Sequence, residues 1–510
     1  MTFLSLRRVL CACVVAAAAM AALAAPGTAS ASDLSQQCSG SNIKGLGSTF
    51  QQPAEEVWTS NFNASTDTNV FGCAGNTGQG SLGKPTVTYD QSSGHTGSGA
   101  CLKAFGGGEA PKYNEYGFCG TDEAPTVAKI EEMESHKEGG KTGEKGIETI
   151  PTAQGAEAVI IHLPAKCVAQ STVASGTKKV ILGRLALDNS TVEQIFRGAI
   201  TNWKQVEAAQ TDNSTKITCT GGAAEEETPI NVVVRLDKSG TTHIFKSYLA
   251  QVFTGKIAME AFNEPEGAGK GKPCKAELPE EEKTWKQVQE GCENQRWPTA
   301  AKVVRPSAAG NPAVIQEVNA KASSISYADL AVARKEGFFS KKGVGGENKK
   351  GSETKVGEQH QEFWAEVQNS ATAGGTYADP SSNGDIEKLA NSNCAGTVYA
   401  SEPGEKFPPK STRETWFAVK AELVQKKSNI CGLTYELALR EYKPYLNPFG
   451  VSEAAGKEEA TTVENFLYYA INAKAFGGGA LLKNHDYEKL SGTVLKEAET
   501  GVKEIGYAVP

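Results

Sequence analysis

Strand-like and helix-like patterns of apolar residues alternate along this chain, and one junction between them is especially informative. Val232, Val233 and Val234 form an apolar run that predicts a strand ending at Arg235. Beyond a polar turn, apolar residues return at helical spacing, at Ile244, Phe245, Tyr248, Leu249 and Val252. Residues 239–241 (Ser-Gly-Thr) therefore lie at a predicted helix N-terminus, where free backbone N–H groups and the helix dipole favour anions. An arginine and two hydroxyls at such a point suit a tetrahedral oxyanion.

Ser and Thr are also ordinary N-cap residues, so capping alone would explain one such turn. The arrangement recurs, however, in two other places. Residues 45–50 (Gly-Leu-Gly-Ser-Thr-Phe) precede a helical stretch in which Pro53 suits the first turn. Residues 97–105 begin Gly-Ser-Gly and follow the strand-like residues 86–89. Three hydroxyl-bearing helix starts exceed what capping requires and favour a shared anion site.

Together, these turns resemble the phosphate-binding protein of bacterial phosphate ABC transporters. The likeness is carried by Gly47-Ser48-Thr49-Phe50, Gly97-Ser98-Gly99 and Arg235-Leu236-Asp237-Lys238-Ser239-Gly240-Thr241. Segments 118–125, 151–155, 187–203 and 324–327 fit the same family in the same order. The resemblance is strongest from about Gly45 to Val252 and weaker near residues 429–435.

The resemblance implies a set of phosphate ligands and no metal, cofactor or catalytic residue. The implied ligands are Thr49, Phe50, Ser98, Asp122, Arg235, Ser239, Gly240 and Thr241, with Ser48 and Asp237 in support. In this set, Asp122 accepts a proton from the anion, and Asp237 holds Arg235. Hydrogen phosphate has a proton to donate and sulfate at neutral pH has none, so an obligatory acceptor predicts selectivity for phosphate.

Three departures from the family pattern lie beside these ligands. Glu123 stands between Asp122 and an Ala-Pro pair, Lys238 replaces a usual glycine, and residues 51–52 (Gln-Gln) replace a Pro-Ala pair. Glu123 is alternatively a plain surface residue, and Lys238 a solvated turn residue. The departures leave affinity and ligand identity open.

The N-terminus has the features of a signal peptide spanning residues 1–31. Arg7 and Arg8 precede an apolar run, and residues 29–31 (Ala-Ser-Ala) form a small-x-small cleavage site. We therefore expect an exported protein, located in the periplasm, in the cell envelope or outside the cell. No later run reaches the roughly 18 apolar residues of a membrane span. The net charge of −7 disfavours nucleic acid as a partner.

Cysteine usage fits export, because ten of the 12 cysteines lie beyond the predicted signal peptide and no Cys-x-x-Cys motif occurs. Connectivity does not follow from the count. The motifs that converge on the ligand in the resembled family are flanked by Cys101 and Cys119, so we predict that these two pair. Further candidate pairs are Cys274 with Cys292 and Cys394 with Cys431.

The resemblance implies an α/β, two-lobed periplasmic-binding-protein fold of type II, with the ligand in the cleft between the lobes. Residues 32–151 and 430–510 would form lobe 1, and residues 152–429 lobe 2, with crossings near 151–153 and 428–430. The Gly-, Lys- and Glu-rich stretches 134–145, 264–282 and 335–358 are typical of solvated insertions.

The predicted function is that of an extracytoplasmic, high-affinity phosphate receptor that delivers its ligand to an ABC permease by closure of two lobes. Alternatives are a receptor for another oxyanion such as sulfate or molybdate, a secreted phosphoester hydrolase on the same fold, or a sensor or surface-interaction protein. Residues 139–142 (Gly-Gly-Lys-Thr) lack the earlier glycine of a nucleotide loop. His243 follows Ser239 at helical spacing and is a candidate base for it, but no Gly-x-Ser-x-Gly motif surrounds that serine. These observations predict a binding protein that is not an enzyme.

Overall fold

A computed structural model describes residues 40–64, 85–92, 94–138, 146–175, 178–210, 215–261, 280–289, 294–336, 338, 361–369, 376–382, 389–401, 416–423, 430–474 and 477–508. The predicted signal peptide lies outside the described residues, as do residues 139–142, Cys274, Cys292 and most of the three predicted insertions. Of the insertion at 264–282, only residues 280–282 are described, and there a short strand, β11 (Glu281–Lys283), begins.

The described chain alternates strands and helices throughout. The strands are β1 (Ile43–Leu46), β2 (Val87–Asp90), β3 (Phe118–Thr121), β4 (Ile147–His162), β5 (Cys167–Ser175), β6 (Lys178–Leu182), β7 (Ala186–Leu187), β8 (Thr215–Cys219), β9 (Asn231–Val233), β10 (Ile257–Met259), β12 (Val303–Val304), β13 (Ser324–Asp329), β14 (Glu362–Trp364), β15 (Glu366–Gln368), β16 (Tyr377–Ala378), β17 (Tyr399–Ser401), β18 (Val419–Ala421), β19 (Cys431–Leu439) and β20 (Tyr487–Lys489). The α-helices are α1 (Gln52–Ala64), α2 (Ser98–Ala104), α3 (Val127–Glu134), α4 (Asn189–Arg197), α5 (Trp203–Ala209), α6 (Ala223–Glu226), α7 (Gly240–Val252), α8 (Asn311–Ala320), α9 (Leu330–Lys335), α10 (Lys443–Leu446), α11 (Glu453–Ile471), α12 (Gly478–Leu481) and α13 (Gly492–Lys503).

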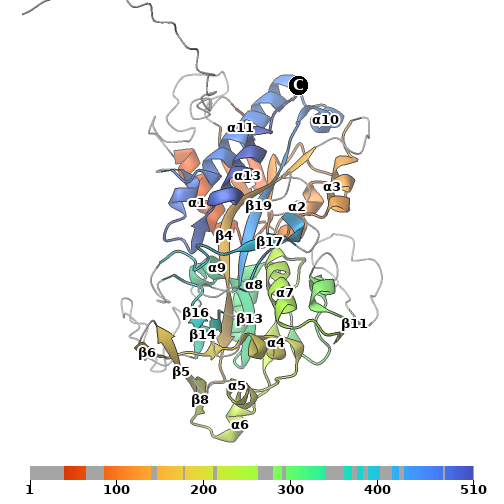
Figure 1. Cartoon of the computed structure of the whole chain (residues 1–510). Coiled ribbons are helices and arrows are strands. Elements are labelled where there is room, and N and C mark those ends of the chain that lie inside the picture. The colour runs from red at the N-terminus through yellow and green to blue at the C-terminus, as the bar shows by residue number, and fades with distance from the viewer. Residues whose placement is uncertain are drawn as a thin grey trace, which may run out of the picture.

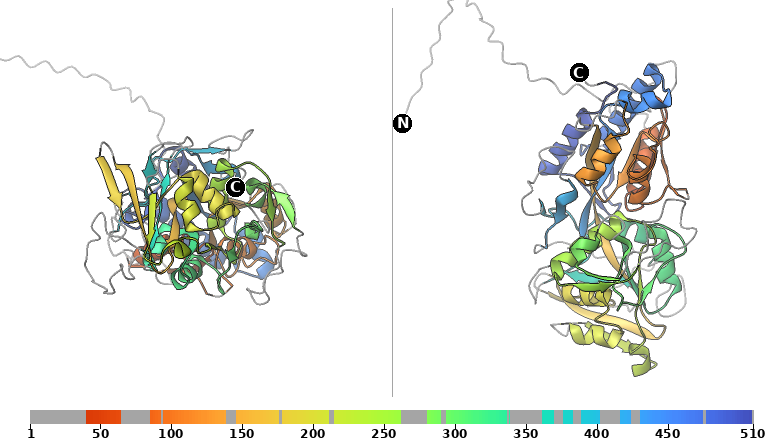
Figure 2. Two further views of the ribbon diagram at one scale, coloured as in Figure 1. Left: turned by 90° about the horizontal axis from the view of Figure 1, so that it is seen from below. Right: turned by 90° about the vertical axis from the view of Figure 1, so that its right-hand side faces the viewer.

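The molecule is elongated and has two lobes (Figure 1). The first lobe contains α1–α3 and α10–α13, so it combines segments from both ends of the described chain, and the second lobe contains α4–α8 (Figures 1 and 2). This arrangement agrees with the predicted architecture, while the exact lobe boundaries stay a prediction.

Strand β4 runs along both lobes and joins them. Its first part, Ile147–Ala156, pairs antiparallel with β19, and its last part, residues 157–162, pairs antiparallel with β13. The predicted crossing at residues 151–153 therefore lies inside this strand. Almost every residue of β4 is buried, because sheet neighbours and helices cover both of its faces.

Four short parallel strands each lead into a helix that begins at the boundary between the lobes. In the first lobe, β1 pairs parallel with β2, and they precede α1 and α2. In the second lobe, β9 pairs parallel with both β12 and β13, and β9 and β12 precede α7 and α8. Since helices that follow parallel strands begin at the strands' carboxyl ends, the fold gathers four helix N-termini in one place.

Two predicted disulfides are confirmed, because Cys101 bonds Cys119 and Cys394 bonds Cys431. A third disulfide, between Cys167 on β5 and Cys219 on β8, was not predicted. The candidate pair Cys274–Cys292 lies outside the described residues. None of the helices in the described ranges combines the length and the apolar character needed to cross a membrane.

Candidate functional site

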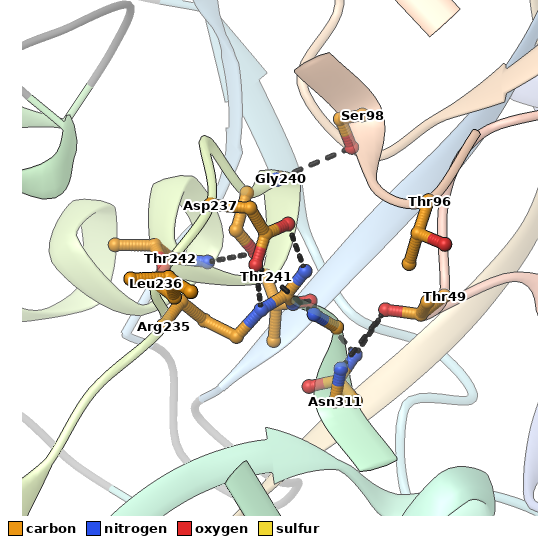
Figure 3. Close-up of polar contacts among 12 residues, drawn as sticks. Thr49, Thr96, Ser98, Arg235, Leu236, Asp237, Gly240, Thr241, Thr242 and Asn311 are labelled. Atoms are coloured by element: carbon orange, nitrogen blue, oxygen red, sulfur yellow. Dashed lines mark hydrogen bonds and ion pairs between the residues drawn. The ribbon is translucent and has the colours of Figure 1, made fainter. Parts of the chain in front are cut away.

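The candidate site lies where α1 and α2 of the first lobe meet α7 and α8 of the second (Figure 3). Two contacts bridge the lobes directly. The backbone N–H of Gly240 donates to Ser98 Oγ at 3.2 Å, and the backbone and side-chain N–H groups of Asn311 donate to Thr49 Oγ1 at 3.1 and 3.3 Å. Residues that are distant in sequence and were predicted to share a site are therefore brought together.

In the first lobe, hydroxyl groups converge on Asp122, which follows β3 and is buried. Ser48 Oγ lies 2.7 and 2.5 Å from the two carboxylate oxygens of Asp122, and Ser98 Oγ lies 3.4 Å from Oδ2. The Asp122 backbone N–H donates in turn to Ser98 Oγ at 3.1 Å. Ser48, predicted only as a supporting residue, is thus the hydroxyl nearest to the carboxylate.

Burial raises the pKa of the Asp122 carboxyl group to about 6, against the opposing effects of hydrogen bonds from Ser48 and Thr434 and of the Arg235 charge. A carboxyl group in this position is an acceptor above that pH and a donor below it. It therefore meets the chemical requirement for recognising the proton of a bound anion.

In the second lobe, the guanidinium group of Arg235 is buried and held in place. Its Nε and Nη2 atoms donate to Asp237 at 2.9 and 2.5 Å, and its Nη1 donates to Thr241 Oγ1 at 3.2 Å. Asp237 also accepts from the backbone N–H of Gly310 at 3.0 Å. The predicted support of Arg235 by Asp237 is seen as a two-point ion pair, the geometry that fixes an arginine best.

Gly97, the residue before α2, has a φ of 91°, which favours glycine, and its Cα lies against the Asp237 carboxylate. A Cβ here would lie only 2.4 Å from an Asp237 carboxylate oxygen, so a side chain would disturb the carboxylate that holds Arg235. Gly240 is equally constrained, since an added Cβ would lie 2.6 Å from Cβ of Asp122.

Asn311 was missed by the sequence interpretation. Its side chain donates to Thr49 and also to Thr241 Oγ1 at 3.1 Å, so one amide joins a hydroxyl from each lobe (Figure 3). Its Oδ1 atom is buried and has no hydrogen-bond partner among the described residues. The only signal in the sequence is a Gly-Asn-Pro helix start at residues 310–312, which has no hydroxyl.

The two threonine hydroxyls retain donor capacity. In the contacts among the described residues, Thr49 Oγ1 and Thr241 Oγ1 act only as acceptors, of two N–H groups each. A hydroxyl also has one O–H to donate, so both groups can still donate to an anion.

Two of the predicted ligand residues, Ser239 and Phe50, also make structural contacts. Ser239 caps α7, because its Oγ accepts from the Thr242 N–H at 3.3 Å, and Asn294 holds its backbone. Ser239 therefore does fill the ordinary capping role that was considered as an alternative. The ring of Phe50 packs edge-on against Tyr487, and the Phe50 carbonyl accepts from the Tyr487 hydroxyl.

The residues that depart from the family pattern are buried or half-buried and pack against or bond to their neighbours. The suggestion that Glu123 is a surface residue is wrong: it is buried, and its backbone is bonded to the Thr121 hydroxyl. Lys238 is half-buried and packs against Gly99 of the other lobe, so it is not simply a solvated turn residue. Gln51 donates to Glu55 and Glu436 and accepts from Thr434.

His243 is turned away from Ser239. Its Nδ1 lies 3.1 Å from the Gln289 carbonyl oxygen, and burial lowers the pKa of the ring to about 4. A neutral ring in that contact donates Nδ1–H to the carbonyl, which fixes its orientation. Within the described ranges, no group of three or more His, Cys, Asp or Glu side chains is placed to hold a metal ion.

The two-lobed α/β fold agrees with the comparison with known families. The profile of the PBP superfamily domain matches residues 26–474, so the chain belongs to that superfamily. This match confirms the predicted periplasmic-binding-protein fold.

Two relatives that match part of the chain are phosphate-binding proteins. Over 88 residues, the chain is 36% identical to phosphate-binding protein PstS2 of Mycobacterium bovis (strain BCG / Pasteur 1173P2) and to PstS 2 of Mycobacterium tuberculosis (strain ATCC 25618 / H37Rv). The match covers 17% of this chain and 22% of each relative, about a fifth of their length. A solved structure of a high-affinity periplasmic phosphate-binding protein (PfluDING) bound with phosphate aligns over 92% of this chain and 100% of its own, with 14% identity and a TM-score of 0.49.

Proposed function

We propose that this protein binds inorganic phosphate between its two lobes and acts as a receptor rather than an enzyme. The observation that carries this proposal is the convergence of four helix N-termini, Arg235 and the buried carboxyl group of Asp122 at the lobe boundary. The names of the mycobacterial relatives support the same ligand.

The site offers what hydrogen phosphate requires. Arg235, the hydroxyls of Thr49, Ser98 and Thr241, and the N–H groups of Phe50, Ser239 and Gly240 would supply donors, and helix dipoles from both lobes add positive potential. The N–H groups of Ser239 and Gly240 would exchange their present acceptors, Asn294 and Ser98, for the anion. Asp122 supplies an acceptor for the anion's proton, supported by Ser48. Sulfate would place an unprotonated oxygen against this acceptor, which is unfavourable.

Ligands contributed by two lobes couple binding to closure. An anion held by both lobes has more contacts in the closed form than in the open form, and this difference in affinity shifts the equilibrium. We further propose that the protein works outside the cytoplasm, after removal of residues 1–31, and delivers phosphate to a membrane-embedded ABC permease. The signal-peptide features and the family resemblance support this step.

Calorimetric titration tests the proposal. The mature chain is unfolded, refolded in phosphate-free buffer, and titrated with phosphate, sulfate and molybdate. We expect one phosphate per chain and no heat from sulfate. Sulfate or molybdate binding without phosphate binding would identify another oxyanion as the ligand.

The same preparation tests for catalysis. A receptor takes up phosphate stoichiometrically and does not turn over an aryl phosphate ester. Multiple turnovers that are abolished by Arg235→Ala would instead support the hydrolase alternative.

A further inference from the structure

Glu157 is a buried carboxyl group to which the site as described gives no role. It lies on β4, where the strand passes from one lobe to the other, and it is only 2% exposed. Neither carboxyl oxygen has a hydrogen-bond partner among the described residues. A buried carboxyl group without partners is unfavourable, so this one needs an explanation.

Sheet register places Glu157 beneath the candidate site. Residues two apart on a strand share a face, so Gly155, Glu157 and Val159 point to the same side of β4. A Cβ at Gly155 would contact the ring of Phe50, one of the proposed ligands. Val159 pairs with Tyr327, whose hydroxyl accepts from the Arg235 N–H at 3.5 Å. Glu157 therefore lies between the elements that hold Phe50 and Arg235.

Charged and titratable groups approach Glu157 from each neighbouring segment. They are Asp122 beyond β3, Asp329 directly opposite on β13, Arg235 beyond β9, and the Tyr327 hydroxyl. Burial first, and then the charges of Asp122 and Asp329, raise the pKa of Glu157 well above its ordinary value, and Arg235 opposes this only in part.

The buried carboxyl groups of Asp122 and Glu157 therefore have opposite surroundings. Asp122 receives hydrogen bonds from Ser48 and Ser98 that stabilise its charge, whereas Glu157 receives none. When surroundings separate two carboxyl groups in this way, one is suited to be the proton acceptor and the other the acid.

We propose that Glu157 is a further ligand of the anion, which enters the site as the neutral carboxylic acid and donates its O–H to an oxygen of bound phosphate. This inference rests on the proposed function. The proton removes the repulsion between a buried carboxylate and the anion, and the anion gives the carboxyl group its missing partner. Ionisation of Glu157 would therefore release phosphate.

The test compares phosphate affinity across a pH series for the wild type, Glu157→Gln and Glu459→Gln. Glutamine resembles the protonated acid, since it is neutral and has N–H groups to donate. The control Glu459 lies on α11, far from the site in sequence, and burial raises its pKa to about 7. Phosphate's own ionisation affects all three proteins and cancels in the affinity ratios.

We expect the affinity ratio of wild type to Glu157→Gln to be constant at acid pH and to fall about tenfold per pH unit once Glu157 ionises, because one proton is linked to binding. The ratio of wild type to Glu459→Gln stays constant. Glu157→Val, which has no donor, binds phosphate about tenfold more weakly than Glu157→Gln at every pH. Thermal unfolding of each variant confirms that it is folded.

A ratio of wild type to Glu157→Gln that does not change with pH would overturn this inference while leaving phosphate binding intact. Equal affinities of the Gln and Val variants would also overturn the proposed contact. If none of the proteins binds phosphate at any pH, the proposed function itself fails, which is a different outcome. Should Glu157→Gln not fold, infrared difference spectra of Asp122→Asn, with and without phosphate, replace it: a shift of the carbonyl band of a protonated carboxyl group on phosphate binding supports the contact, and an unchanged band overturns it.

Discussion

The two lobes contribute to the candidate site in opposite ways. The first lobe presents a carboxylate, Asp122, surrounded by serine hydroxyls, and the second presents a guanidinium group, Arg235, surrounded by Asp237 and Thr241. Each central charge is satisfied mainly within its own lobe. The hydrogen bonds that cross the site, Gly240 to Ser98 and Asn311 to Thr49, join neutral groups.

This difference bears on how the lobes separate. At the site, opening breaks neutral hydrogen bonds, worth about 1 kcal/mol each, and leaves the ion pair of Arg235 with Asp237 intact. The charge of Arg235 therefore stays paired with Asp237 when the lobes separate. A ligand that engages both Arg235 and Asp122 adds a charged contact across the site, where the protein itself has only neutral hydrogen bonds.

The largest expected effect comes from removing the charge of the second lobe. Arg235→Ala should weaken phosphate binding by about 2–4 kcal/mol, because a buried charge-assisted contact is lost. Calorimetry measures it, and Arg235→Lys serves as the control that keeps the charge but not the forked geometry. Unchanged affinity in the alanine variant would place the anion elsewhere.

Substitution of Asp122, the central charged group of the first lobe, should change both ligand selectivity and the free energy of unfolding. Asp122→Asn should admit sulfate, since an amide can donate as well as accept. Because the Asp122 pKa is raised to about 6, its burial favours the neutral form, and wild-type stability is lost as pH rises from about 4 to 6.

The ligand-free Asn variant should therefore be more stable than the wild type at pH 7, by at most about 3 kcal/mol, and should lose this advantage below about pH 4. Urea unfolding at the two pH values measures the difference. An advantage of equal size at both pH values would mean that the carboxyl group's ionisation is not its cause.

The neutral hydrogen bonds between Asn311 and Thr49 should show an energetic coupling that depends on closure of the lobes. A double-mutant cycle of Thr49→Val with Asn311→Ala crosses the lobes, whereas Thr241→Val with Asn311→Ala stays within the second lobe. We expect the first coupling, about 1 kcal/mol, to be larger with phosphate bound than without it, and the second to be the same in both states. Equal behaviour of the two pairs would mean that phosphate does not alter contact between the lobes.

The smallest effect is expected at the surface. Lys335 on α9 pairs with Glu56 on α1, but the two side chains are 42% and 49% exposed. Lys335→Ala should change phosphate affinity by less than about 1 kcal/mol, an effect that salt reduces further. Lys129→Ala, which breaks the exposed pair with Glu132 within the first lobe, is the matched control. A larger loss of phosphate affinity for Lys335→Ala alone would mean that its ion pair with Glu56 helps to hold the lobes closed.

The helix starts at Ser48, Ser98 and Ser239 could be predicted because their signals are local: a strand pattern, a small-residue turn and a helix pattern within about 15 residues. The family resemblance then predicted that these three helix starts share one site. The contact between Asn311 and Thr49 joins residues 262 positions apart, and nothing around a Gly-Asn-Pro start predicts its partner.

The burial of individual polar residues could not be predicted from the sequence either. Glu123 is charged and next to a turn, which favours exposure, yet the packing around β3 encloses it. The missing partners of Glu157 are a property of its tertiary surroundings and leave no trace in the residues beside it. The Cys167–Cys219 bond likewise depends on the antiparallel pairing of β5 with β8.

The continuity of β4 has a consequence for unfolding. One unbroken strand supplies the central pairing of the first lobe through β19 and of the second through β13, so neither lobe can melt without removing a strand from the other's sheet. The two lobes should therefore behave as one cooperative unit, with a single calorimetric transition, and the amide protons along β4 should be among the last to exchange with solvent.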